Sequence, residues 1–179
     1  MRKGFVLWLT GLPGSGKTTI SGILKQQLQS RGLQVEILDG DEVRKNLSPN
    51  LGFSKEDREI HAKRVAYVSQ LLARNGINVI VALISPYRSF RDNARAMIGE
   101  GFFEVWVKAS PETCRQRDPK GLYKKASAGQ ISNLTGIQDT YEEPLNPELV
   151  VDTEARNVNE CVNMILGLLK QYRYLSNHD

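Results

Sequence analysis

Short unbroken runs of apolar residues recur along the chain, separated by segments in which apolar residues lie three or four positions apart. Each unbroken run predicts a strand that is buried on both faces, and these runs lie at residues 5–10, 35–38, 78–84, 103–107 and 148–151. The spaced segments predict helices, at residues 17–31, 41–47, 54–75, 87–98, 111–117 and 157–172. This alternation predicts an α/β fold of three layers, in which a five-stranded parallel sheet has helices on both faces.

Polar residues mark the start of two of these helices. Asp41 is placed to cap the helix that follows from Glu42, and Ser54 with Asp57 resembles a capping box at the start of the long helix. Residues 118–140 differ from the rest, because they lack a clean periodicity and are rich in Lys, Gly and Ser. Such a long irregular stretch in a compact domain is often functional.

The composition fits one domain over residues 1–179, of which 40% are hydrophobic. The net charge of +4 suits a protein that handles polyanionic small molecules, and it is too small to argue for a nucleic-acid partner. Cys114 and Cys161 form no C-x-x-C pattern, so we expect reduced thiols and a cytoplasmic location. The first apolar run is too short for a signal peptide, and no run is long enough to span a membrane.

Chemically useful residues follow the first three predicted strands. In a parallel sheet with helices on both faces, ligands bind beyond the carboxyl ends of the strands. A glycine-rich loop at 11–18 follows the first strand, Asp39-Gly40-Asp41 follows the second, and Ser85-Pro86-Tyr87-Arg88 follows the third. We therefore expect these three segments to converge on one cleft.

The loop at 11–18 reads GLPGSGKT and matches the P-loop pattern G-x-x-x-x-G-K-[ST]. Its glycines allow backbone N–H groups to face phosphate oxygens, and the start of the following helix adds a positive dipole end. Lys17 is expected to reach the β- and γ-phosphates of a nucleotide, and Thr18 to offer its hydroxyl to Mg²⁺.

The carboxylates of Asp39 and Asp41 suit phosphoryl transfer, which needs a group to orient the attacking hydroxyl and carboxylates near the metal. Asp39 is predicted to be catalytic or linked to the metal. For Asp41, a role as the N-cap of the following helix is as good an explanation as a catalytic role.

Arg44, Phe53 and Arg58 lie between the second strand and the long helix. Arginine recognises phosphate or sulfate with two parallel hydrogen bonds, and phenylalanine stacks on a base. An ordinary alternative is that they are two surface arginines and a core phenylalanine, and the residues alone leave this open. Residues 115–125 carry five basic side chains, and beside a P-loop we expect a lid over about 118–140 that excludes water, rather than a merely solvated loop.

Four segments together give the chain a close resemblance to adenylylsulfate kinases. They read WLTGLPGSGKTT, LDGDEVRKNLSPNLGFSKEDR, ISPYRSFRDNAR and RDPKGLYKKASAGQISNLTGIQDTYEEPLNPE, and they extend over most of the chain. The resemblance implies a P-loop kinase fold with a mobile lid. It also implies that ATP and Mg²⁺ are used to phosphorylate the 3′-hydroxyl of adenylylsulfate (APS), giving 3′-phosphoadenylylsulfate (PAPS) for sulfate assimilation.

The resemblance also implies roles for individual residues. The ATP site would comprise Gly11, Leu12, Pro13, Gly14, Ser15, Gly16, Lys17, Thr18, Thr19 and Arg117. APS would contact Asp41, Arg44, Phe53, Arg58, His61, Ile84, Ser85, Pro86, Tyr87, Lys120 and Leu134. Catalysis would fall to Lys17, Asp39, Asp41 and Ser85, and the metal to Thr18 and Asp39. The family further implies a homodimer and a sulfurylase partner, although no sulfurylase domain is fused within this chain.

Ser85 has two readings within the family, as a phosphoserine intermediate or as a substrate contact. The sequence places no general base beside Ser85, so we expect a substrate contact and direct in-line transfer. Two positions depart from the family pattern: His61 replaces an asparagine that contacts substrate, and Leu134 replaces a phenylalanine. If that phenylalanine stacks on the adenine opposite Phe53, Leu134 weakens APS binding by about 1 kcal/mol or more, and a Leu134→Phe variant with an unchanged KM for APS would contradict this.

Other classes of function fit the chain less well. Another small-molecule kinase, of the gluconate or shikimate type, would share the P-loop but has no need of the LGFS and KGLYKKA segments. A non-catalytic nucleotide-binding protein would not need Lys17, Thr18, Asp39 and Asp41 together. A GTPase is disfavoured because the chain has no N-K-x-D motif.

Overall fold

Five parallel strands form one sheet in the order β2-β3-β1-β4-β5. The computed structural model describes residues 3–176. The strands are β1 (Val6–Thr10), β2 (Val35–Asp39), β3 (Asn78–Ala82), β4 (Phe102–Lys108) and β5 (Leu149–Asp152). The helices are α1 (Lys17–Ser30), α2 (Gly40–Leu47), α3 (Lys55–Arg74), α4 (Arg88–Ile98), α5 (Pro111–Arg117), α6 (Leu122–Ser127) and α7 (Val158–Gln171).

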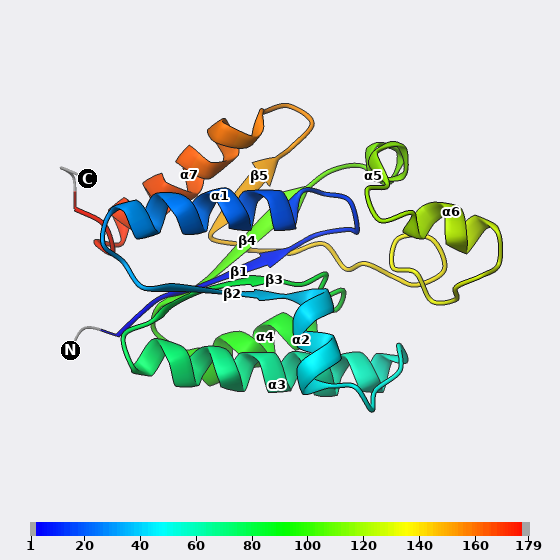
Figure 1. Cartoon of the computed structure of the whole chain (residues 1–179), viewed down its shortest axis with the longest axis horizontal. Coiled ribbons are helices and arrows are strands. Elements are labelled where there is room, and N and C mark those ends of the chain that lie inside the picture. The colour runs from blue at the N-terminus through cyan, green and yellow to red at the C-terminus, as the bar shows by residue number, and fades with distance from the viewer. Residues whose placement is uncertain (1–2, 177–179) are drawn as a thin grey trace.

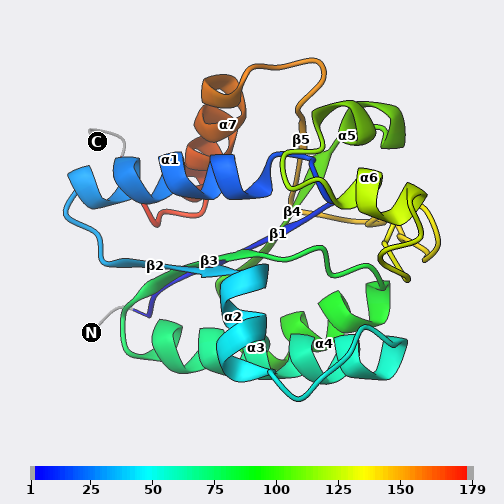
Figure 2. The same cartoon turned by 45° about the vertical axis from the view of Figure 1, so that its right-hand side comes forward.

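The sheet lies between two helical layers, so the predicted α/β fold is confirmed. Helices α1 and α7 lie on one side of the sheet, and α2, α3 and α4 lie on the other (Figures 1 and 2). Helices α5 and α6 lie together at one end of the molecule, beside the loop between β1 and α1.

Alternating side chains of β1 and of Phe5, which immediately precedes it, supply both halves of the core. Phe5, Leu7 and Leu9 pack into one buried cluster with residues of α1 and α7. Val6 and Trp8 pack into a second cluster with residues of α2, α3 and α4. Because a central parallel strand is covered on both faces, each residue of the run is apolar, which is why the sequence reads as an unbroken hydrophobic stretch.

The strand register brings the carboxyl ends of the strands to one edge. Thr10 pairs with Trp106 across β1 and β4, and Asp39 pairs with Ala82 across β2 and β3. The loops that follow these strands therefore start from neighbouring points, as predicted.

Two details of the predicted elements are corrected. The helix α2 begins at Gly40 and its N-cap is Asp39, whose side chain accepts a hydrogen bond from Asp41 N, so Asp41 is not the cap. Residues 118–140, predicted to lack regular structure, contain the short helix α6. The predicted cap of α3 is confirmed for Ser54, whose side chain accepts from Asp57 N, although the Asp57 carboxylate accepts from Gly52 N instead of returning to Ser54.

Within residues 3–176, no helix is both long enough and apolar enough to cross a membrane.

Candidate functional site

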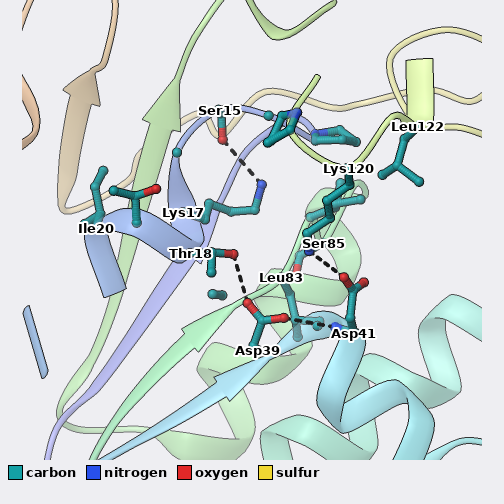
Figure 3. Close-up of a pocket in the computed structure, with 18 of the residues that line it drawn as sticks. Ser15, Lys17, Thr18, Ile20, Asp39, Asp41, Leu83, Ser85, Lys120 and Leu122 are labelled. Atoms are coloured by element: carbon teal, nitrogen blue, oxygen red, sulfur yellow. Dashed lines mark hydrogen bonds and ion pairs between the residues drawn. The ribbon is translucent and has the colours of Figure 1, made fainter. Parts of the chain in front are cut away.

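A cavity of about 800 Å³ lies at the carboxyl edge of the sheet, a volume in the usual range for small-molecule sites. Figure 3 shows its centre, where Lys17, Thr18, Asp39, Asp41, Ser85 and Lys120 approach one another from different segments. Its walls come from residues 13–20, 39–41, 44, 53, 58, 61–62, 82–86, 90, 117–120, 122–123, 153 and 156–158. The predicted convergence of three strand ends on one cleft is therefore present, and further segments complete it.

The P-loop has the backbone shape that its glycines permit. Gly14 and Gly16 have φ of 81° and 105°, in the region that favours glycine. A Cβ at Gly14 would lie 2.9 Å from the carbonyl oxygen of Cys114, so a larger residue would push the loop away from α5. Sequence reasoning placed these glycines correctly because only glycine tolerates both the turn and the close approach.

Lys17 is turned inward toward its own loop. Its Nζ donates to the carbonyl oxygens of Gly11 and Leu12, both at 2.8 Å, and to Ser15 Oγ at 3.3 Å. Burial lowers the pKa of Lys17 to about 8, because the charged form loses its hydration. The carbonyl oxygens replace part of that hydration, and a nucleotide phosphate would have to replace them.

Thr18 and Asp39 form the junction between the P-loop and β2. Thr18 Oγ1 donates to Asp39 Oδ2 at 2.9 Å, and Asp39 Oδ1 accepts from Asp41 N at 3.2 Å. These hydroxyl and carboxylate oxygens are the hard ligands that Mg²⁺ prefers, and Mg²⁺ completes its shell with water and substrate phosphates. Among residues 3–176 no group of three or more His, Cys, Asp or Glu could hold a metal ion.

Lys120 closes the cavity from the side of residues 118–140. Its ammonium group forms an ion pair with the carboxylate of Asp41 (Figure 3). That partner raises the pKa of Lys120 above its ordinary value. Both side chains are partly exposed, and exposed ion pairs contribute little net stability, so an anionic ligand can exchange with Asp41 at small cost.

An exposed phenylalanine lies close to two arginines on the other wall. Phe53 is 56% exposed, and the guanidinium carbons of Arg44 and Arg58 lie 4.5 Å and 5.7 Å from its ring centroid. Phe53 is therefore no core residue, which removes the ordinary alternative for it. Burial lowers the pKa of Arg44, with a smaller contribution from the charge of Arg58. The three side chains can together accept a planar base and an anion.

His61 lines the same wall from within α3. It is buried, and its Nδ1 lies 2.9 Å from Ser48 Oγ, whereas its Nε2 has no hydrogen-bond partner among the described residues. Arg64 also donates to Ser48 Oγ, and the hydroxyl keeps both a hydrogen to donate and a second acceptor site, so it pairs with either tautomer of His61. Burial, and next the charges of Arg44 and Arg64, lower the pKa of His61 to about 4. A neutral histidine whose Nε2 has no partner among the described residues therefore occupies this position.

Ser85 adopts a left-handed backbone conformation with φ of 45°, which a non-glycine residue adopts only when its surroundings hold it. Its Oγ accepts a hydrogen bond from Trp8 Nε1 at 3.0 Å, and its carbonyl oxygen accepts from Arg91 Nη1 at 2.6 Å. Thr10 Oγ1 donates to the neighbouring carbonyl of Ile84 at 2.7 Å. Among the described residues, no carboxylate or imidazole forms a hydrogen bond with Ser85 Oγ.

Four of the predicted site residues lie outside the cavity walls: Gly11, Leu12, Tyr87 and Leu134. Tyr87 donates to Asp139 Oδ1 at 2.8 Å, and Leu134 packs in a small buried cluster with Leu12, Cys114, Tyr123 and Ala126. Leu134 is therefore buried between the segment 118–140, to which it belongs, and residues of the P-loop and α5. A contact of Leu134 with an adenine stays a prediction.

Sequence reasoning missed the loop between β5 and α7. Thr153, Arg156, Asn157 and Val158 line the cavity. Arg117, which was predicted, donates to Thr153 Oγ1 at 2.9 Å and to Thr153 O at 2.7 Å, and Thr153 Oγ1 donates to Ser15 O at 3.0 Å. The rule that ligands gather beyond strand ends would have pointed here if it had been applied to the fifth strand as well.

The chain is similar to proteins of one family over nearly its whole length. A family model described as adenylylsulphate kinase matches residues 3–152. An adenylyl-sulfate kinase of Rippkaea orientalis is 50% identical over 175 residues, which cover 98% of this chain and 96% of that protein. A probable adenylyl-sulfate kinase of Aeropyrum pernix is 50% identical and covers 95% of this chain and 94% of that protein.

Solved structures agree with the sequence comparison. The APS kinase CysC of Mycobacterium tuberculosis, solved in complex with AMPPNP and APS, has a TM-score of 0.91 and 39% identity, and covers 95% of this chain and 99% of that one. A gluconokinase of Sinorhizobium meliloti, with a TM-score of 0.62 and 18% identity, shares only the fold and covers 96% of this chain and 95% of that one. The family match, the relatives at half identity and the shared fold lead to one conclusion: this chain belongs to the adenylylsulphate kinase family.

Proposed function

We propose that the chain transfers the γ-phosphoryl group of ATP to the 3′-hydroxyl of adenylylsulfate, which yields PAPS and ADP. The observation that carries this proposal is the content of one cavity: a P-loop, a pair of aspartates and an arginine–phenylalanine wall line the same space. APS offers a matching set of groups, namely a base to stack, an anionic sulfate–phosphate and a hydroxyl to phosphorylate.

The residues divide the work of phosphoryl transfer between them. Backbone N–H groups of residues 13–18 and the start of α1 bind the phosphates of ATP, and Lys17 neutralises charge that develops on the transferred group. Asp39 orients the attacking 3′-hydroxyl and accepts its proton in the transition state. APS is held by Arg44, Phe53, Arg58 and His61. When APS binds, the ammonium group of Lys120 leaves Asp41 and pairs with an anionic group of the substrate.

Magnesium would be held by Thr18 Oγ1 and the Asp39 carboxylate, whose oxygens are already adjacent. When bound, Mg²⁺ would neutralise negative charge on the phosphates of ATP.

Direct transfer is the mechanism that the surroundings of Ser85 favour. A phosphoserine route needs a base that removes the serine proton. The hydrogen bond that Ser85 Oγ receives comes from the indole of Trp8, which is a donor and cannot act as a base. Ser85 is therefore assigned to substrate contact.

Self-association belongs to the same proposal. A structural neighbour from Thiobacillus denitrificans is described as a hexameric APS kinase, and a relative from Sorangium cellulosum is described as a probable bifunctional SAT/APS kinase. We therefore propose that this chain self-associates, with the homodimer that the family resemblance implies as the expected form, and that a sulfurylase can supply its substrate.

The deciding experiment measures ADP release from ATP and Mg²⁺ with APS, AMP, gluconate, shikimate or no acceptor. ADP and PAPS formed with APS alone are the expected result. ADP formed with another acceptor would overturn the assignment of APS as the substrate but not the kinase activity. Nucleotide binding without turnover on any acceptor would overturn the proposal that the chain is an enzyme.

A further inference from the structure

A buried arginine, Arg91, holds the turn that presents Ser85 to the cavity. It lies in α4 and is 2% exposed, so its charge is almost wholly removed from water. Its Nε donates to Glu104 Oε1 at 2.6 Å, its Nη1 to Ser85 O at 2.6 Å and its Nη2 to Glu142 O at 2.7 Å. A planar guanidinium with several fixed donors is the side chain that can join three partners in this way.

The three partners of Arg91 belong to three different parts of the molecule. Ser85 belongs to the turn after β3, Glu104 to β4, and Glu142 to the segment that returns from residues 118–140. Glu142 N also donates to Pro86 O at 2.8 Å, so the turn and the returning segment lie directly against each other. The arginine therefore ties a wall of the cavity to the end of the predicted lid.

The Ser85 conformation needs this support. With φ of 45°, Ser85 lies in a left-handed region that is strained for a non-glycine residue. Trp8 and Glu104 are direct neighbours across β1 and β4. The sheet thus fixes the serine hydroxyl through Trp8 Nε1, and it fixes the serine carbonyl through Glu104 and Arg91.

We propose that Arg91 is a positioning residue for the acceptor substrate: it holds the 84–87 turn in the shape that contacts APS and couples that turn to the segment at 141–143. This inference rests on the proposed function, because it assigns the turn to APS. Arg91 does not line the cavity, so it acts through Ser85 rather than by touching the substrate.

Arg91→Lys is the test, because lysine keeps the charge opposite Glu104, but its single nitrogen cannot reach all three partners, each of which is held by a different nitrogen of the guanidinium. Arg95→Lys is the matched control, since Arg95 lies on the same helix and pairs with Glu104 and Glu148. No hydrogen bond from Arg95 to the 84–87 turn is present within residues 3–176. Both variants disturb the same ion cluster, and only the first alters the support of the turn.

Two readouts are measured on both variants. In the free chain, hydrogen exchange of the peptide that contains residues 84–87 is expected to be about tenfold faster in Arg91→Lys and unchanged in Arg95→Lys. In steady-state kinetics, Arg91→Lys is expected to raise the KM for APS about tenfold while the KM for ATP stays within about twofold. Equal exchange and equal KM values for APS in the two variants would overturn the proposal.

A second variant guards against failure to fold. Arg91→Gln combined with Glu104→Gln removes both charges together, so that no buried charge is left unpaired, and the same two results are expected. If the wild-type chain does not turn over APS, the proposed function fails. The rate of hydrogen exchange in residues 84–87 then still decides whether Arg91 supports the 84–87 turn.

Discussion

Asp39 has two tasks, and one substitution separates them. Its side chain caps α2 and accepts a hydrogen bond from Thr18 at the predicted metal site. Asparagine caps helices as well as aspartate does, so Asp39→Asn is expected to leave the free energy of unfolding within about 0.5 kcal/mol. Without the carboxylate, kcat is expected to fall by about 100-fold or more.

Thermal unfolding and steady-state turnover check this together, and Asp39→Ala, which also loses the cap, is the comparison. A variant Asp39→Asn with undiminished kcat would remove Asp39 from the chemistry.

Lys17 is expected to make proton uptake on nucleotide binding depend on pH. Its pKa is lowered to about 8 in the free chain, and a nucleotide phosphate beside it would raise that value again. Above pH 8 the free lysine is largely neutral, so nucleotide binding must take up a proton. At pH 8.5 we expect an uptake of about 0.7 proton per nucleotide, falling toward zero as the pH is lowered to 7.

Calorimetry in two buffers of different ionisation enthalpy measures this uptake. Lys17→Arg is the control, because a guanidinium stays charged throughout. An uptake in Lys17→Arg equal to that of the wild-type chain would assign the proton to another group.

At the scale of elements, α6 shows how tertiary contact makes a helix that the sequence pattern does not predict. It has only six residues, LYKKAS, too few for a periodic apolar stripe to be recognised. Tyr123 and Ala126 are buried against Leu12 and Cys114, and Tyr123 Oη donates to Pro13 O at 3.0 Å. The helix thus depends on the P-loop, a partner more than a hundred residues away.

Loss of this contact is expected to loosen α6. In Tyr123→Phe the hydrogen bond to Pro13 O is absent and that carbonyl stays buried, at a cost of about 1 kcal/mol. Trypsin cleavage after Lys124 or Lys125 is expected to become about fivefold faster, because the open state is more populated.

The exposed Tyr67 supplies the matched control, Tyr67→Phe, for which cleavage should not change. Equal cleavage of wild-type chain and Tyr123→Phe would mean that the hydroxyl does not hold α6 on the P-loop.

The long helices and central strands could be predicted because each carries its own periodicity. The start of α2 was misplaced by one residue, because Gly40 gives no helical signal and both neighbouring aspartates are good caps. The contacts of Leu134 were beyond the sequence for a different reason. Its neighbours come from the P-loop, α5 and α6, and no local pattern encodes such a meeting.

At the scale of the molecule, the site could be predicted in outline because a parallel sheet gathers its strand ends. From the sequence alone, that rule predicts that the P-loop, Asp39 and Ser85 lie together. It does not reveal partners that reach the site through side chains, such as Arg91, or the loop with Thr153, whose chemistry is unremarkable in sequence.

Acid stability of the whole molecule should depend on His61. Its pKa in the folded chain is lowered to about 4, so the unfolded chain binds the proton first and stability is lost as the pH falls from about 6.5 toward 4. The His61→Asn variant lacks this titrating group. Between pH 7 and pH 5 its free energy of unfolding is expected to fall by about 2 kcal/mol less than that of the wild-type chain.

Urea unfolding at the two pH values measures the difference. His178, which lies outside the described residues, is common to both proteins and cancels. The same loss in both would mean that His61 takes up its proton without unfolding the chain.

The division of the cavity between separate stretches of chain has a consequence for protein engineering. The P-loop leads into α1 on one side of the sheet, whereas Arg44, Phe53 and His61 belong to the continuous stretch 40–61 on the other side (Figure 2). The same sheet serves a kinase with 18% identity, so the scaffold tolerates wide change. A designer who seeks a new acceptor can therefore vary the side chains of residues 40–61 that line the cavity, together with the 84–86 turn and Lys120, and leave the ATP-handling loop untouched.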